Sequence, residues 1–145
     1  MIVLDTNVVS EIMRPRPAGE VLAWIDAQAT TELWLTSTVA AELMFGVARL
    51  PDGARKQQFA RSVSGMLEHE FAGRVLPFDL AAASVLAELL ARRERAGQAL
   101  ALADAQIASV CLAHGATLAT RNQKHFEGLG LALVNPWAAA APMGA

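Results

Sequence analysis

The strongest constraint on the fold is the way short apolar runs alternate with longer helical stretches along the chain. Each run has the length of a buried strand, and residues that favour turns or helix caps follow several of them. The five runs span residues 1–4, 33–36, 74–78, 116–120 and 131–134. Strands that alternate with helices in this way predict an α/β domain with a mainly parallel sheet of about five strands and helices on both faces.

Five further segments have the apolar spacing or the end signals of helices. They span residues 19–29, 38–50, 54–71, 80–95 and 102–114. We expect Ser37 or Thr38 to cap the second of these helices and Asp79 to cap the fourth. With 145 residues and no repeat or linker, the chain fits one domain over residues 1–137. The Ala-rich end, residues 138–145, is predicted to be a frayed tail.

Three carboxylates lie in apolar surroundings, where a folded chain usually places hydrophobic side chains. Asp5 ends the first apolar run, and Glu42 and Asp104 lie inside apolar segments. We expect all three to be partly buried, and no Lys or Arg lies within four residues of any of them. An unpaired buried carboxylate is strongly unfavourable, so a divalent cation such as Mg²⁺ is the expected partner of the cluster.

The predicted sheet can bring these residues to one edge, because ligands of open α/β sheets bind outside the carboxyl ends of the strands. Asp5 and Asn122 are expected in strand-end turns, and Glu42 and Asp104 near helix starts beside the same edge. One or two divalent cations held there can activate water, orient a phosphodiester and offset the charge that develops on it. The sequence therefore predicts metal-assisted phosphate chemistry.

Simpler roles stay open for each residue. Asp5 can be a helix cap, and Glu42 and Asp104 can be favourable charges near the first turn of a helix. Thr6 and Thr120 can orient a carboxylate or a metal-bound water through their hydroxyls, or they can merely cap a turn. The coincidence of these residues at one predicted edge favours a site over separate caps.

Two other reactive side chains are predicted to have no catalytic role. His125 is expected to be an exposed loop residue, although contact with a substrate stays open, and Cys111 is expected in a helix core. The sequence has neither a Gly-x-x-x-x-Gly-Lys-Ser/Thr loop nor a Gly-x-Gly-x-x-Gly loop, so cradling of nucleoside triphosphates or dinucleotides is not supported. The formal net charge of −2 means that any polyanion must be held by local positive groups.

The composition is unusually apolar, with 54% hydrophobic residues and a mean hydropathy of +0.33. This surplus predicts a surface that is buried against a partner. Every apolar run is shorter than the roughly 18 residues of a membrane span. Asp5 comes too early for a signal peptide, so we expect a cytoplasmic protein without a membrane association.

Four segments occur in one order and spacing: residues 2–7 (IVLDTN), 38–46 (TVAAELMFG), 102–108 (LADAQIA) and 119–122 (ATRN). Together they resemble the PIN-domain ribonucleases, and the resemblance extends from residue 1 to about residue 137. The run after residue 7 and the Asn-Pro-Trp ending at residues 135–137 make the chain most similar to the VapC toxins, in particular the FitB-like branch.

The resemblance implies a Mg²⁺- or Mn²⁺-dependent endoribonuclease that is the toxin of a toxin–antitoxin module. It also implies a homodimer and a cognate antitoxin that covers the active site and often binds operator DNA. Asp5, Glu42 and Asp104 match the family's acidic metal-binding positions. Asn122 stands where the fullest family pattern has a fourth Asp, and its amide can bind a cation but brings no negative charge.

Two rival interpretations remain. The missing fourth acid is compatible with a non-catalytic PIN-like module that binds RNA or a protein, although the three intact acids argue against it. A structure-specific DNA nuclease would need additional acids and a threading arch, for which a chain of this length has little room. If the toxin interpretation holds, we expect the antitoxin to place an Arg or Lys against the acids. We also expect it to bury an apolar segment against the apolar surface that the composition predicts.

Overall fold

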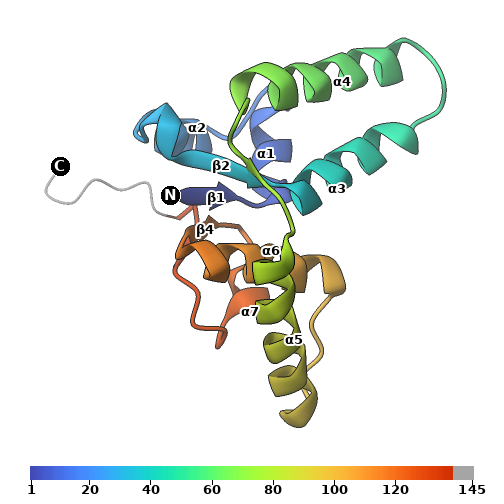
Figure 1. The fold of residues 1–145 in the computed structure, drawn as a ribbon. Helices are drawn as coiled ribbons and strands as arrows, with labels where there is room; N and C mark the ends of the chain where they lie inside the picture. The colour runs from blue at the N-terminus through green and yellow to red at the C-terminus, as the bar shows by residue number, and fades with distance from the viewer. Residues whose placement is uncertain (139–145) are drawn as a thin grey trace, which may run out of the picture.

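The computed structural model describes residues 1–138, and its centre is a five-stranded parallel sheet (Figure 1). The strand order is β3-β2-β1-β4-β5, which places β1 in the middle. The strands are β1 (Ile2–Leu4), β2 (Leu33–Thr36), β3 (Val75–Leu76), β4 (Thr117–Ala119) and β5 (Leu133–Val134). The predicted sheet is confirmed, with strands that are shorter than expected. Apart from residue 138, the predicted tail lies outside the described residues.

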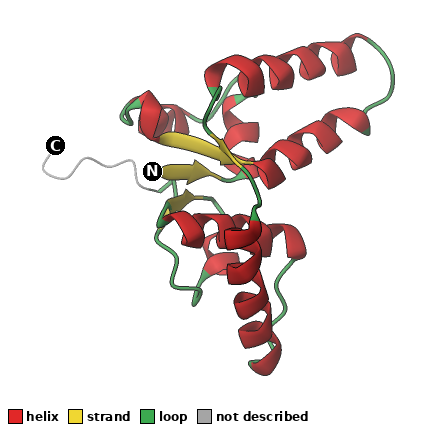
Figure 2. Cartoon of the chain, viewed as in Figure 1, coloured by secondary structure: helices red, strands yellow, loops and turns green. Residues whose placement is uncertain are grey.

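Helices connect the strands and cover both faces of the sheet (Figure 2). The α-helices are α1 (Thr6–Ile12), α2 (Gly19–Asp26), α3 (Ser37–Ala48), α4 (Ala54–Gly65), α5 (Leu80–Arg95), α6 (Leu102–His114) and α7 (Gln123–Phe126). The steps from β1 to β2 to β3 run in one direction, so right-handed crossovers place α1 to α4 on one face. The path from β3 to β4 reverses direction and places α5 and α6 on the other face.

The core lies around the central strands. Val3, Leu4, Leu35 and Leu118 have no exposed surface. Burial of each such side chain stabilises the fold by about 1.5–3 kcal/mol. Because β1 has a strand on each side and helices above and below, its carboxyl end is held from four directions. The residue that follows β1 therefore has a well-defined position.

Two short helices were not expected from the sequence. Helix α1 follows β1 directly, and α7 is a single turn after β4. Neither is long enough to show a repeated apolar spacing, which is the signal on which a helix prediction depends. A short 3₁₀ helix, η1 (Thr30–Glu32), was missed for the same reason. The predicted helix over residues 54–71 is divided, because α4 ends at Gly65 and a π-helical turn, η2 (Met66–Glu70), continues it.

The predicted caps have different outcomes. Asp79 caps α5 as expected, because its carboxylate accepts the backbone N–H of Ala82 (3.0 Å). The predicted caps of α3, Ser37 or Thr38, are wrong: Thr36 is the cap, and its hydroxyl accepts the backbone N–H of Val39 (3.1 Å). Thr36 keeps the extended backbone of β2, which lets its side chain reach the first turn.

Within residues 1–138, no helix is both long enough and apolar enough to cross a membrane. The cytoplasmic location stays a prediction.

Candidate active site

Asp5 lies at the carboxyl edge of the sheet, as predicted. Its backbone N–H donates to the carbonyl of Ala119 (2.9 Å), which ties the end of β1 to the end of β4. Its carboxylate Oδ1 accepts the backbone N–H of Thr6 (2.8 Å) and caps α1. The residue is only 5% exposed. Asp5 is thus buried, as predicted, and it also fills the simpler predicted role of a helix cap.

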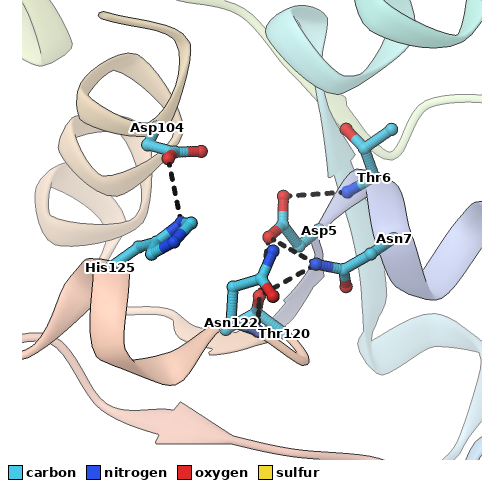
Figure 3. A network of polar contacts seen from close by, with 7 residues as sticks. All are labelled: Asp5, Thr6, Asn7, Asp104, Thr120, Asn122 and His125. Carbon is cyan, nitrogen blue, oxygen red and sulfur yellow. Dashed lines mark hydrogen bonds and ion pairs between the residues drawn. The ribbon is translucent and has the colours of Figure 1, made fainter. Parts of the chain in front are cut away.

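A buried hydroxyl, that of Thr120 just after β4, orients the second oxygen of Asp5 (Figure 3). It donates to Asp5 Oδ2 (2.7 Å) and accepts the backbone N–H of Asn122 (3.1 Å). The Asn7 amide Nδ2 lies 3.3 Å from both the Thr120 hydroxyl and Asp5 Oδ2. Asn7 Oδ1 accepts the backbone N–H of Arg121 (3.2 Å). With one donated and two accepted bonds, the Thr120 hydroxyl has no free capacity.

Glu42 lies in the second turn of α3. Its Oε1 accepts the hydroxyl of Thr6 (2.6 Å), so Thr6 orients a carboxylate, which is one of its two predicted roles. The predicted partial burial of Glu42 is wrong, because the residue is exposed. Helix α3 runs outward from the sheet (Figure 1), so the strand ends no longer cover its second turn. A hydrogen bond between Thr38 and Gln106 (3.3 Å) ties the start of α3 to α6.

Asp104 lies in the first turn of α6, as predicted, and faces α7. Its Oδ2 lies 3.5 Å from Nδ1 of His125, and its side chain is 25% exposed. His125 is exposed, as expected, but it lies on a helix and contacts a site carboxylate. Figure 3 shows this pair across from the Asp5 network, with the side chain of Asn122 extending toward Asp5.

The pKa values of both site aspartates are raised, mainly by burial. Burial raises the pKa of Asp5, and the charge of Asp104 adds to this; hydrogen bonds from Thr120 and Thr6 oppose it. Burial also raises the pKa of Asp104, as does the charge of Glu42, while His125 lowers it. Among residues 1–138, none of the three carboxylates forms an ion pair with a Lys or Arg.

The three carboxylates interact electrically but do not converge. Over the described part of the chain, no three His, Cys, Asp or Glu side chains are grouped closely enough to hold a metal ion in their present positions. Glu42 is bonded to Thr6, and Asp104 is paired with His125. Like charges favour such separation, so the carboxylates of the two helices are turned toward different partners.

A family model described as the PIN domain matches residues 2–130 of the chain. The chain belongs to the PIN-domain family. It is 46% identical to the VapC ribonuclease Y4jK of Sinorhizobium fredii, over 94% of this chain and 98% of that protein. It is 38% identical to the Toxin FitB of Neisseria gonorrhoeae, over 94% of this chain and 99% of the relative.

Solved structures agree with this assignment of the PIN domain. The crystal structure of FitAcB from Neisseria gonorrhoeae matches with a TM-score of 0.88 at 38% identity, over 95% of this chain and 99% of the other. VapBC2 from Rickettsia felis, bound to a DNA fragment from its promoter, matches with a TM-score of 0.79 at 27% identity, over 93% and 98% of the two chains.

The donor chemistry of this PIN domain fits a hard divalent cation. Asp5 and Asp104 are carboxylates with raised pKa values and no Lys or Arg partner, and Glu42 adds a third negative charge next to them. Carboxylate and amide oxygens are the ligands that Mg²⁺ and related ions take in proteins. Asn122 adds an amide oxygen at the same edge without adding charge.

Two residues of this network were missed by sequence reasoning. Asn7 was given no role in the site, yet it joins Asp5, Thr120 and the backbone of the loop that follows β4. His125 was expected to be an exposed loop residue, and its contact with Asp104 was not predicted. Two of the three partners of Asn7, Thr120 and Arg121, lie more than 110 residues away along the chain, and no local pattern indicates such contacts.

Proposed function

We propose that this PIN domain is a toxin ribonuclease that hydrolyses phosphodiester bonds in RNA with the help of Mg²⁺ or Mn²⁺. Asp5, Glu42 and Asp104 are the proposed metal ligands and catalytic residues, and Thr6, Thr120 and Asn122 support them. The observation that carries the proposal is the buried, doubly hydrogen-bonded Asp5 beside two further acids with no Lys or Arg partner. Such a charge excess is stable with a divalent cation.

The relatives supply the reaction class. A VapC ribonuclease and a toxin align with nearly the whole chain. The first relative supports cleavage of RNA over cleavage of DNA, and the second supports the role of a toxin. The dependence on Mg²⁺ or Mn²⁺ rests on the donor set alone.

Each residue has a physical role in this account. When bound, the divalent cation supplies Lewis-acid polarisation of the phosphodiester and offsets the negative charge that grows on it. Asp5 is fixed in one orientation by the N–H of Thr6 and the hydroxyl of Thr120. Thr6 uses its own hydroxyl to hold Glu42. Asp104 keeps its carboxylate toward the same edge through its contact with His125.

The proposed partner is a cognate antitoxin that covers the acids, and the toxin itself is proposed to be a homodimer in the cytoplasm. An Arg or Lys of the antitoxin would offset the burial and, to a lesser extent, the repulsion between acids that raise the pKa values of Asp5 and Asp104. The VapBC2 structure on promoter DNA supports a complex that also binds operator DNA through the antitoxin.

One observation favours a second candidate function, a PIN-like module that binds RNA or a protein without cutting it. Within the described residues, the three acids are not grouped for metal binding, and Asn122 replaces the fourth acid. A single experiment separates the two candidates.

The test is cleavage of a panel of structured and single-stranded RNAs by the antitoxin-free protein, with Mg²⁺, Mn²⁺ or a chelator. We expect metal-dependent cutting that falls by more than about 100-fold in Asp5→Asn and Asp104→Asn, since even residues behind metal ligands contribute about 10–100-fold. Asp26→Asn, at an exposed acid on α2, is the matched control and should cut normally. A folded protein that binds the RNAs but cuts none would favour the binding module.

A further inference from the structure

The segment beyond Glu42 has a charge opposite to that of the whole chain. Residues 43–65, which include the second half of α3 and all of α4, carry four cationic side chains and one acid, a net charge of +3. The complete chain has a net charge of −2. Figure 1 shows α3 and α4 projecting from the sheet and joined by a loop at their far ends. We call this projection, residues 37–65, the α3–α4 arm.

A groove leads from the candidate active site along this arm. Its first part, a hollow of about 360 Å³, is lined by Thr6, Glu42, Phe45 and Arg49, among others. Its second part, a hollow of about 460 Å³, is lined by residues that include Arg14 and Arg55. The two hollows share Ser10, Gly46 and Phe59 in their linings, so they adjoin each other along the arm, and we call them together the arm groove.

The first part of the arm groove follows one face of α3. Phe45 and Arg49 come three and seven residues after Glu42, a spacing that places all three on the same face. Phe45 is 63% exposed, which is unusual for a large aromatic side chain. The Arg49 guanidinium lies over its ring, 5.5 Å from the ring centre. An exposed aromatic face and a cation thus stand next to a site carboxylate.

The second part of the groove adds further positive charge. Arg55 is exposed, and among residues 1–138 it forms no ion pair. Arg14 is paired with Glu11 (3.2 Å), but its side chain remains 67% exposed. Three arginines therefore surround the groove, and the site acid Glu42 is the one carboxylate that lines it in the described part of the chain.

This combination matches the chemistry of a single nucleic-acid strand. Proteins hold such strands with cations along the phosphates and with aromatic rings on which bases stack. We infer that the arm groove binds the single-stranded stretch of RNA next to the scissile phosphodiester, with a base on Phe45 and phosphates on Arg49 and Arg55. The inference rests on the proposed function, because it takes RNA as the substrate of the adjoining site.

The test measures RNA binding separately from cleavage. The probe is a labelled single-stranded RNA of about 12 nucleotides, within the roughly 4–16 nucleotides that single-strand sites cover. Its dissociation constant for the full chain carrying Asp5→Asn is measured by fluorescence anisotropy at several salt concentrations. The same background then receives Phe45→Leu, Arg49→Gln or Arg55→Gln. Arg95→Gln, at an exposed arginine at the end of α5, is the control.

Phe45→Leu should weaken binding by roughly 5-fold to 100-fold, because it removes the stacking face while keeping an apolar side chain. Each arginine change should weaken binding and reduce the slope of log affinity against log salt by about 0.7, the effect of one lost phosphate contact on a single strand. Arg95→Gln should leave both quantities unchanged. All these side chains are exposed, so equal thermal unfolding midpoints should verify that the variants are folded.

Groove variants that bind the RNA like Arg95→Gln would overturn the inference. Weakened binding of an antitoxin with unchanged RNA binding would also overturn it and would identify a protein-docking surface. A failure of the proposed function has a different signature: the native chain would cut no RNA, whatever the affinities of the groove variants.

Discussion

The two sides of the candidate site differ in how firmly they hold their carboxylates. On the side of the sheet, Asp5 is almost fully buried, and its two oxygens accept hydrogen bonds from Thr6, Thr120 and Asn7. On the side of the helices, Glu42 is exposed and has a single hydroxyl partner. The sheet therefore supplies a fixed acid, and α3 supplies an acid that can turn.

This difference has a functional consequence. A buried carboxylate with fixed orientation does not have to be reordered when a cation binds. An exposed carboxylate can leave one hydrogen-bond partner and turn toward a cation at little cost. We therefore propose that the acids, which are separated in the described structure, come together on a cation when Glu42 turns. Asp5 with its hydrogen-bond partners is the fixed half of this proposed site, and Glu42 with Thr6 is the mobile half.

Among changes outside the three acids, the largest effect is expected from Thr120→Val, which removes a hydrogen bond of the fixed half. The change removes the hydroxyl that orients Asp5 and leaves the Asn122 N–H without its partner. We expect activity to fall about 10–100-fold and the free energy of unfolding to fall by about 1–3 kcal/mol. Steady-state cleavage and urea unfolding measure the two effects.

A smaller effect is expected from Thr6→Val, which breaks the mobile half. The exposed bond from the Thr6 hydroxyl to Glu42 contributes little to stability, so the free energy of unfolding should change by no more than about 0.5 kcal/mol. Activity should fall by less than about tenfold. The comparison fails if Thr6→Val destabilises the protein more than Thr120→Val does.

Asn122→Asp adds a fourth acid next to the fixed half and so tests whether this edge of the sheet binds a cation. Asn122 is exposed, so one added charge should favour a divalent cation by about 1 kcal/mol, or roughly fivefold in affinity. Isothermal titration with Mg²⁺ measures the change, and Gln57→Glu, which adds an acid at an exposed residue of α4 on the α3–α4 arm, is the control. Weaker Mg²⁺ binding by Asn122→Asp would contradict a metal site at this edge.

The smallest effect is a pH dependence of stability without metal. The raised pKa of Asp5 means that the folded state holds this proton more tightly than the unfolded state does. The stability of the native chain relative to Asp5→Asn should therefore fall as the pH rises from the ordinary Asp value through the raised one. Urea unfolding of both proteins over this range, with a chelator, measures it. A relative stability that rises with pH would show that folding lowers the pKa of Asp5 instead of raising it.

Much of this arrangement could be predicted from the sequence, because it depends on local signals. Apolar runs predicted the strands, and the position of Asp5 after the first run predicted its place at the sheet edge. Asp104 near a helix start was predicted in the same way. These residues owe their positions to the elements in which they lie.

The rest depends on contacts between distant segments. The exposure of Glu42 follows from the direction in which α3 leaves the sheet, and an apolar neighbourhood in sequence does not report that direction. Asn7 and His125 belong to the site through partners on other elements. Helices α1 and α7 are too short to show a period. Long-range geometry, rather than propensity, decides these features.

The most direct test of the account is a crystal structure of the antitoxin-free protein soaked with Mn²⁺, with the ion located by its anomalous scattering. The account predicts an ion bound by the carboxylates of Asp5 and Asp104, with Asp5 still bonded to Thr120 and Glu42 turned away from Thr6. An ion that does not contact Asp5, or an Asp5 that must leave Thr120 to bind it, would contradict the division into a fixed and a mobile half.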